Sequence, residues 1–189
     1  MRIGVLAVQG AFAEHIEKLS ELGVKSFEIR QQKDINRSFD GLILPGGEST
    51  TMRKLLTELD LIEPLKKCIP NGMPVLGTCA GMILLAGEIS GGEASCFGTL
   101  DITVKRNAYG RQLGSFRCKD RFCNHIIEMP FIRAPFAERV GDNVTILSKH
   151  ENKIVAVRQD NQLALAFHPE LTDDMTVYEY FLGIVKNHI

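Results

Sequence analysis

The sequence predicts an α/β fold: a doubly wound, mostly parallel sheet with helices on both faces and additional short strands in the C-terminal half. In the first half, short apolar runs alternate with amphipathic segments of helical periodicity, as in strands joined by covering helices. In the second half, shorter and often β-branched runs are broken by Asn, Asp and Gly, which is typical of added strands. No linker or repeat interrupts this pattern, so we expect one domain spanning residues 1–189.

The first half begins with a continuously apolar run, RIGVLAVQG, as expected for a strand covered on both faces. In the next segment Phe12, Ile16 and Leu19 share one helical face, and Gly23 marks its end. A polar connection separates the second and third strands. The remaining predicted strands of this half are 25–30, 40–47 and 73–77, and the remaining helices are 49–59 and 61–69.

The second half contains the strand-like runs TLDITVKRN and NVTILSKHENKIVAVRQDNQLALAFHPE, and a third around MPFIRAP. Within the second run, SKHENKIVAV predicts a hairpin with its turn near Asn152. Acidic residues precede an apolar-periodic run at the end of the chain, which predicts a closing helix within 171–189.

Composition excludes several classes of partner. The formal net charge is −1 and no basic tract is present, which disfavours nucleic acid and anionic membranes. No apolar stretch approaches the roughly 18 residues that span a bilayer. Ile3–Val8 is too short for the apolar part of an export signal, and the five cysteines are an odd number, so we expect a cytoplasmic protein with free thiols.

The stretch Gly77-Thr78-Cys79-Ala80-Gly81 lies where a predicted strand turns into a helix. Glycines two positions either side of Cys79 allow the close packing of a nucleophile elbow, as in Gly-x-Ser-x-Gly hydrolases. A thiol at a helix start is favoured as thiolate, and the amide of Ala80 is placed to stabilise an oxyanion. The alternative is a buried cysteine in a tight strand-to-helix turn.

A second candidate group lies at the end of the strand LALAF, where His168-Pro169-Glu170 follows. On an extended chain His168 and Glu170 share a side, so Glu170 is placed to orient the imidazole. His168 would take the proton of Cys79 and later donate it to a leaving amine. Both candidates lie at the carboxyl edge, where parallel sheets place their sites. A histidine at a strand end is otherwise most often structural.

The third candidate is the loop Pro45-Gly46-Gly47, also at a strand end. Its backbone amides can approach a ligand closely and supply a second oxyanion donor. The alternative is an ordinary turn in which Ser49 or Thr50 caps the next helix, and the two interpretations are compatible.

Together, GTCAG, PGGESTT and FHPEL resemble the triad-type, class I glutamine amidotransferases, which have a flavodoxin-like fold. More narrowly, the blocks GVLAVQGAFAEH, LILPGGESTTM, VKRNAYGRQLGSF, FIRAP and FHPELTDD are similar to the glutaminase subunits of pyridoxal 5'-phosphate synthases. The resemblance implies hydrolysis of L-glutamine through a Cys79 thioester, without a cofactor or metal. It also implies that ammonia passes to a synthase subunit, within a large hetero-oligomer, for vitamin B6 biosynthesis.

The resemblance implies further site residues. It places glutamine against Gly47, Glu48, Ser49, Arg106, Ile132 and Arg133, an oxyanion hole at Gly47 and Ala80, and synthase contact and oxyanion-hole ordering at Gln9 and Gly10. Arg106 and Arg133 are candidates for binding the α-carboxylate of glutamine, or for the interface. For each, the alternative is a solvated arginine at a strand end.

The chain departs from that family in the connection Lys119–Glu128, which is short and is flanked or occupied by Cys118, Cys123 and His125. These residues lack the usual spacing and the second ligand pair of a zinc site. The departure concerns local structure and partner docking, and it leaves the three catalytic candidates unaffected.

Three other functions remain open from the sequence. The first is amidotransfer to another acceptor, as in imidazole glycerol phosphate synthase. The second is a cysteine peptidase or chaperone of related fold, although these usually draw their histidine from another position. The third is a regulator with a vestigial site, which the presence of all three catalytic candidates disfavours.

Overall fold

The computed structural model describes residues 1–107 and 114–188, so part of the block VKRNAYGRQLGSF lies outside the described residues. Its main sheet has the strand order β2-β1-β3-β4-β12-β11-β9-β6-β5. The first five strands of this order are parallel to one another. They are β2 (Lys25–Ile29), β1 (Arg2–Leu6), β3 (Gly41–Leu44), β4 (Val75–Thr78) and β12 (Gln162–Leu165). The predicted fold class is confirmed.

The other half of the sheet is mixed. Antiparallel pairs join β12 to β11, β11 to β9 and β9 to β6, and a parallel pair joins β6 to β5. The strands are β11 (Lys153–Gln159), β9 (Phe136–Val140), β6 (Leu100–Lys105) and β5 (Ala86–Ile89). A further strand, β10 (Thr145–His150), pairs with β11. Glu151 and Asn152 join them with φ of 46° and 64°, as a two-residue hairpin turn requires, so the predicted hairpin is confirmed.

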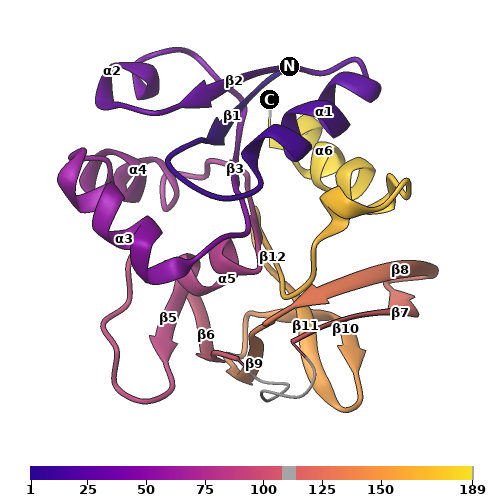
Figure 1. The fold of residues 1–189 in the computed structure, drawn as a ribbon. Coiled ribbons are helices and arrows are strands. Elements are labelled where there is room, and N and C mark those ends of the chain that lie inside the picture. Colours follow the sequence, from indigo (N-terminus) through magenta and orange to yellow (C-terminus); the bar gives the residue numbers. More distant parts are fainter. Residues whose placement is uncertain (108–113, 189) are drawn as a thin grey trace.

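Helices cover both faces of the parallel strands (Figure 1). On one face lie α1 (Phe12–Glu21) and α6 (Thr176–His188), and on the other lie α3 (Ser49–Glu58), α4 (Ile62–Cys68) and α5 (Ala80–Leu85). The short α2 (Gln32–Ile35) was not predicted. It forms in the polar connection because the side chains of Gln31 and Asp34 satisfy its first amides in a capping box.

A separate two-stranded sheet is formed by β7 (Ser115–Phe122) and β8 (His125–Ile132). Cys123 and Asn124 form its turn, so the divergent connection is a regular hairpin. The sequence did not show this, because Asp120 interrupts the apolar inner face of β7, whose outer face carries Arg117, Lys119 and Arg121. The end of β8 contains the predicted run MPFI, and it lies beside β12 and the 3₁₀ helix η1 (Pro169–Leu171).

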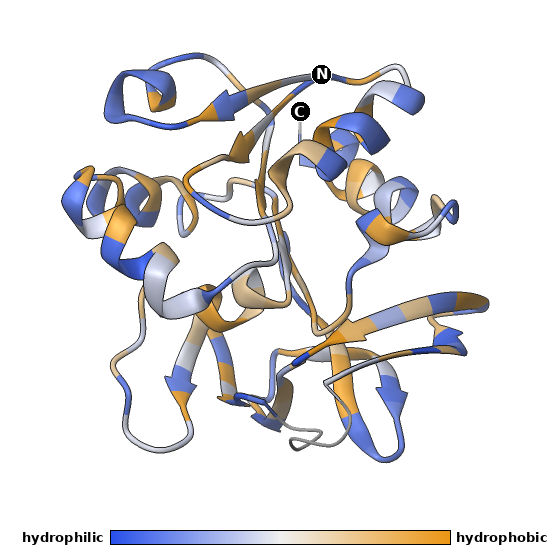
Figure 2. Cartoon of the chain, in the orientation of Figure 1, coloured by the Kyte–Doolittle hydropathy of each residue, from blue (hydrophilic) through white to orange (hydrophobic). Residues whose placement is uncertain are grey.

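The core lies around β3, β4 and β12, whose residues are all buried. In Figure 2 the central strands are mainly hydrophobic, and hydrophilic residues lie on the outer faces of the helices. The register pairs Leu44 of β3 and Ala164 of β12 with Gly77 of β4, so these three strands end at one edge. Within the described residues, no helix is long and apolar enough to cross a membrane.

Candidate active site

Cys79 lies in the sharp turn between β4 and α5. Its φ of 49° and ψ of −99° are outside the regions that residues with a side chain favour. The amide of Cys79 donates to the carbonyl of Leu165 in β12 (2.8 Å), which anchors the turn to the neighbouring strand. A Cβ at Gly81 would lie 2.1 Å from the carbonyl oxygen of Leu44, so only glycine allows α5 to approach β3 this closely. The local geometry is therefore that of an elbow.

His168 and Glu170 follow β12 at the same edge. The Nδ1 atom of His168 lies 2.7 Å from Oε1 of Glu170, and both side chains are almost entirely buried. The other ring nitrogen, Nε2, is also buried and has no hydrogen-bond partner. The backbone amide of His168 donates to the carbonyl of Pro130 (2.9 Å), so β8 helps to hold the ring. The imidazole is thus oriented at Nδ1 and free at Nε2.

The charge states of the imidazole of His168 and the carboxylate of Glu170 depend on each other. Burial opposes the charged form of His168, but the Cys79 sulfur and the Glu170 carboxylate outweigh this and raise the pKa of His168 to about 10. Burial also opposes ionisation of Glu170, yet His15 and His168 lower the pKa of that carboxyl. The site therefore favours an imidazolium next to a carboxylate at neutral pH.

The thiol of Cys79 donates to the carbonyl of Ile132 at the end of β8 (3.8 Å) and makes no hydrogen bond to His168. The sulfur is nevertheless close enough to raise the pKa of His168. Catalytic hydrogen bonds are often long in structures without substrate and tighten when substrate binds. The structure thus brings Cys79 and His168 close together, and the hydrogen bond between the sulfur and Nε2 is expected to form when substrate binds.

A cavity of about 250 Å³ opens over the sulfur. This is below the roughly 300–1,000 Å³ typical of drug-sized ligands, which suits a ligand as small as an amino acid. Predicted residues that line it are Gln9, Gly47, Glu48, Ser49, Cys79, Arg106, Ile132, Arg133 and His168; Ile83 and Asn107 complete the lining. Ala80 is buried and does not line the cavity, and its amide lies at the start of α5, where helix amides lack partners within the helix.

The glycine loop supports the imidazole, which sequence reasoning missed. A Cβ at Gly46 would lie 2.4 Å from Cε1 of His168, so a side chain there would displace the ring. Gln9 and Gly10 pack against the other side of the loop. The amide of Glu48 donates to Oε1 of Gln9 (3.0 Å), and a Cβ at Gly10 would lie 1.9 Å from the Gly46 carbonyl oxygen. The end of β1 therefore positions this loop.

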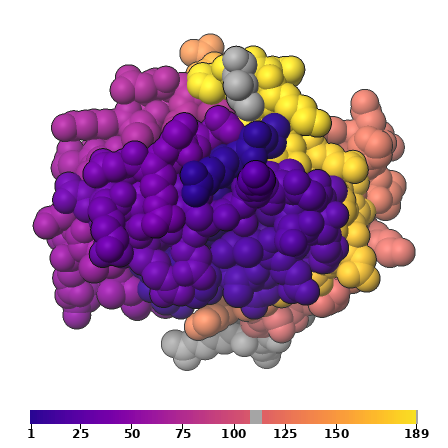
Figure 3. Space-filling model, turned by 90° about the horizontal axis from the view of Figure 1, so that it is seen from above, coloured from indigo at the N-terminus to yellow at the C-terminus, as the bar shows by residue number. Residues whose placement is uncertain are grey.

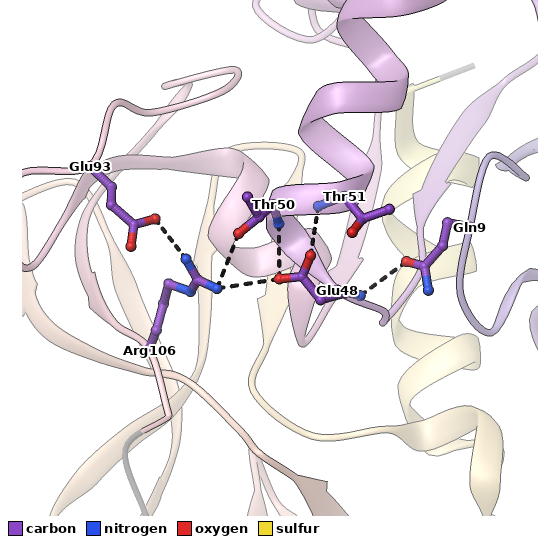
Figure 4. A network of polar contacts seen from close by, with 6 residues as sticks. All are labelled: Gln9, Glu48, Thr50, Thr51, Glu93 and Arg106. Carbon is purple, nitrogen blue, oxygen red and sulfur yellow. Dashed lines mark hydrogen bonds and ion pairs between the residues drawn. The ribbon is translucent and has the colours of Figure 1, made fainter.

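Glu48 and Arg106 belong to one polar network (Figure 4). The Glu48 carboxylate accepts from the amides of Thr50 (3.2 Å) and Thr51 (2.6 Å), so it caps α3. Partial burial opposes its charge, but these hydrogen bonds lower the pKa of Glu48 to about 2. Arg106 contacts Glu93 (2.7 Å) and Glu48 (3.4 Å). Two carboxylates thus already neutralise this guanidinium.

Arg133 differs from Arg106. It follows β8, lines the cavity, and has a φ of 44°. Its amide donates to the carbonyl of Gly114 (2.7 Å), and within residues 1–107 and 114–188 its guanidinium has no carboxylate partner. Of the two predicted arginines, Arg133 is the one with positive charge available to an anion.

His15 was not predicted as a site residue. The sequence offered a signal for it, because His15 directly precedes Ile16 and therefore lies near the apolar face of the segment that forms α1. A histidine at such a position signals a buried imidazole with polar partners. It lies on α1, fully buried, 3.6 Å from Oε2 of Glu170 and 3.2 Å from Oγ1 of Thr78.

The residues of the divergent hairpin do not form a metal site. Cys118 lies 3.6 Å from His150 of β10, Cys123 forms the turn, and His125 is exposed. Within the described residues no group of three potential ligands converges. All five cysteines lie in the described part of the chain and are free thiols.

Comparisons with known proteins agree with this geometry. The profile of the SNO glutamine amidotransferase family matches residues 5–187. Pyridoxal 5'-phosphate synthase subunit PdxT of Methanocorpusculum labreanum is 57% identical over 98% of both chains. The subunit of the same name from Haemophilus influenzae is 52% identical over 98% of this chain and 99% of its own. A crystal structure described as a glutamine amidotransferase superposes with a TM-score of 0.91 at 41% identity, covering 97% of this chain and 98% of that one.

Proposed function

The chain belongs to the SNO glutamine amidotransferase family, and from that premise we propose that it is the glutaminase subunit of a pyridoxal 5'-phosphate synthase. It hydrolyses L-glutamine to L-glutamate and ammonia, and residues 1–189 act as one glutamine amidotransferase domain. The observation that carries the proposal is the orientation of His168. Its Nδ1 is bound to Glu170 and its Nε2 has no partner, while His168 and the strained Cys79 line the same cavity.

The reaction begins with the Cys79 sulfur attacking the side-chain amide carbon of glutamine. The raised pKa of His168 favours transfer of the thiol proton to the imidazole as the sulfur attacks. Collapse of the tetrahedral intermediate breaks the C–N bond, and His168 gives its proton to the leaving nitrogen, so ammonia departs and a γ-glutamyl thioester remains. Water, deprotonated by His168, then attacks the thioester and releases glutamate and the thiolate.

Substrate orientation follows from the charges around the cavity. Free glutamine carries an α-carboxylate, which needs cationic or backbone donors. We assign this task to Arg133, because Glu48 and Glu93 already hold Arg106. Glu48 acts mainly by capping α3 and fixing Arg106, while Gly47, Ser49 and Ile132 form the walls.

Charge on the substrate oxygen is stabilised by backbone amides. The amide of Ala80, at the start of α5, and that of Gly47 are the proposed donors. Gln9 and Gly10 set the position of the Gly46-Gly47 loop, so contact of a partner with the end of β1 is transmitted to the oxyanion hole. These residues are the proposed contact with the synthase subunit.

Ammonia from this site serves a synthase subunit within a large hetero-oligomer, in a reducing cytoplasmic setting. The names of the relatives and the five free thiols support this proposal. An imidazole glycerol phosphate synthase or another acceptor enzyme is the second candidate partner. The chemistry at the cavity needs neither a metal nor a cofactor, because a thiolate and an imidazolium supply both the nucleophile and the acid.

The deciding experiment measures glutamate release from glutamine by the purified chain, alone and with the pyridoxal 5'-phosphate synthase subunit. We expect weak release alone and a clear rise on addition of the synthase. The control adds an imidazole glycerol phosphate synthase cyclase subunit, which should change nothing. Full activity of the chain alone, or activation only by the control subunit, would reject the proposed partner.

A further inference from the structure

Behind Glu170, on the side away from His168, lies a second buried histidine. His15 projects from α1 with its side chain fully buried. Its Nδ1 lies 2.8 Å from the hydroxyl of Tyr178 in α6. Its Nε2 lies 3.2 Å from Oγ1 of Thr78, the residue before Cys79, and 3.6 Å from Oε2 of Glu170. Figure 3 shows the N-terminal part of the chain beside the C-terminal helix, on the face where these two elements meet.

The charge state of His15 is fixed by its surroundings. Burial lowers its pKa, and His168 acts in the same direction, while Glu170 and Glu14 of its own helix partly oppose this. Burial, together with Glu170, Glu21 and Glu14, raises the pKa of Tyr178 far above its usual range. The imidazole is therefore neutral and the phenol is a protonated donor at neutral pH.

The neutral ring has two tautomers, and the carboxylate selects between them. Oε2 of Glu170 is buried and has no hydrogen-bond partner. A lone pair on Nε2 facing this ionised oxygen at 3.6 Å would be repelled, whereas an N–H dipole is attracted. The favoured arrangement has Tyr178 donating to Nδ1. Nε2–H then donates to Thr78 and points also at Glu170.

We propose that His15 is a positioning residue of the active site, which holds Glu170 in the orientation that binds His168. The inference rests on the proposed function for the identity of the reaction, and on the contacts above for the role of the residue. With Nε2–H in place, Oε2 has a favourable electrostatic partner and Oε1 is left for Nδ1 of His168. Without it, Oε2 of a buried carboxylate would lose this electrostatic partner, and the carboxyl would rotate or take up a proton.

This arrangement differs from that of an ordinary buried histidine. His15 joins three parts of the fold that lie far apart in the sequence: the elbow strand at Thr78, the carboxylate at Glu170 and the closing helix at Tyr178. Because α1 begins just after Gln9 and Gly10, His15 also links the proposed partner-facing segment to the catalytic carboxylate.

The test compares His15→Leu with His15→Gln, in complex with the synthase. His15→Leu fills the space without a donor, and we expect kcat for glutamine to fall by about 10- to 100-fold with KM nearly unchanged. This is less than the ~10⁴-fold loss seen when an orienting carboxylate of a triad is itself neutralised. His15→Gln keeps an amide donor in place of Nε2–H and should recover most of the lost rate. Tyr178→Phe should act in the same direction as His15→Leu, with a smaller loss.

A second readout does not depend on turnover. In His15→Leu the carboxyl of Glu170 ionises less readily, so the pKa of His168, followed by NMR of its ring protons, should fall. The control is Leu19→Ala, which loosens the same helix without a polar contact. It should leave the pKa of His168 and the rate per folded molecule unchanged. Equal effects of Leu19→Ala and His15→Leu, or an unshifted His168 pKa in His15→Leu, would overturn the proposal.

The two proposals fail in different ways. If the wild-type complex releases no ammonia but the His168 pKa falls in His15→Leu, the positioning role holds and the glutaminase assignment fails. If Cys79→Ala is inactive while His15→Leu retains full rate and the wild-type His168 pKa, the assignment holds and the positioning role is wrong.

Discussion

Residues 1–107 and 114–188 contain two groups in which a cysteine, a histidine and an acid lie together, and one of them is arranged for catalysis. At the carboxyl edge of the sheet, Glu170 occupies Nδ1 of His168 and leaves Nε2 free beside Cys79. On the β7–β10 side, Asp120 (2.9 Å) and Cys118 (3.6 Å) both approach Nδ1 of His150. An imidazole held at one nitrogen by both groups cannot pass a proton from one to the other.

The environments of the two sulfurs also differ. Burial, Asp120 and Glu151 raise the pKa of Cys118, which keeps it a thiol. Cys118 is in a regular strand, and the ring of His150 packs on Phe116 and Phe131 at 5.7 Å between ring centres. Cys79 is at a strained turn and lines a cavity. The comparison shows that a cysteine, a histidine and an acid near one another are not enough for a catalytic triad. The acid must occupy one ring nitrogen and leave the other free for the sulfur, and the sulfur must lie at a strained turn beside a cavity.

The largest expected difference between the groups is in turnover. Cys79→Ala should reduce glutamate release by at least ~10³-fold, because no other group can form the thioester. Cys118→Ala should leave the rate unchanged. The assay is glutamate release by the complex, with far-UV circular dichroism to check folding. Residual activity near the wild-type level in Cys79→Ala would contradict the nucleophile assignment.

The next difference concerns the two histidines. His168→Asn should slow thioester formation by about 10²–10⁴-fold, the usual contribution of a general acid–base group. His150→Asn should leave it intact. Covalent labelling of Cys79 by a glutamine-like electrophile, followed by mass spectrometry, reports the step directly. Undiminished labelling in His168→Asn would count against its role as the base.

A third difference is the pH dependence of stability. The pKa of His168 is about 10, above the ordinary histidine value of about 6.5. Its contribution to the free energy of unfolding is fully present below about pH 6.5 and is lost as the pH rises through about 10. In Cys79→Ala one group that raises this pKa is gone, so the contribution should be smaller and its loss should be complete at a lower pH.

Urea unfolding between pH 7 and 10 measures that contribution, and NMR titration of His168 measures the pKa directly. Cys118→Ala should leave the His168 titration where it is in the wild type. An identical His168 pKa in the wild type and in Cys79→Ala would show that the sulfur and the imidazole do not interact.

The smallest difference is in backbone strain. Because Cys79 has a φ of 49°, Cys79→Gly should be more stable than Cys79→Ala by about 1–3 kcal/mol. In the strand, Cys118→Gly should instead be less stable than Cys118→Ala by about 0.5–1 kcal/mol. Chemical denaturation of the four variants measures both. The same sign at both positions would mean that the elbow is not strained.

Much of the fold follows from local pattern. The alternation of apolar runs with helical segments predicted the parallel half, and the hairpin near Asn152 was predicted from its turn residues. The β7–β8 hairpin was missed because Asp120 interrupts the apolar alternation of β7, although the carbonyls of Pro130 and Ile132 at the hairpin's end contact His168 and Cys79. The helix α2 was missed because its stability comes from a capping box and not from an apolar face.

The sequence by itself determined the elbow at Cys79, the order of the three catalytic candidates along the chain and the sheet edge at which they meet. Local residue patterns are enough for this, because they fix the backbone conformation of the turn and show where each parallel strand ends. Only the tertiary structure decided that Gly46 lies under the imidazole, that Arg106 is neutralised while Arg133 is available, and that His15 lies behind Glu170. These contacts join side chains far apart in the chain. Their geometry is set by the packing of whole strands and helices, which no short stretch of sequence encodes.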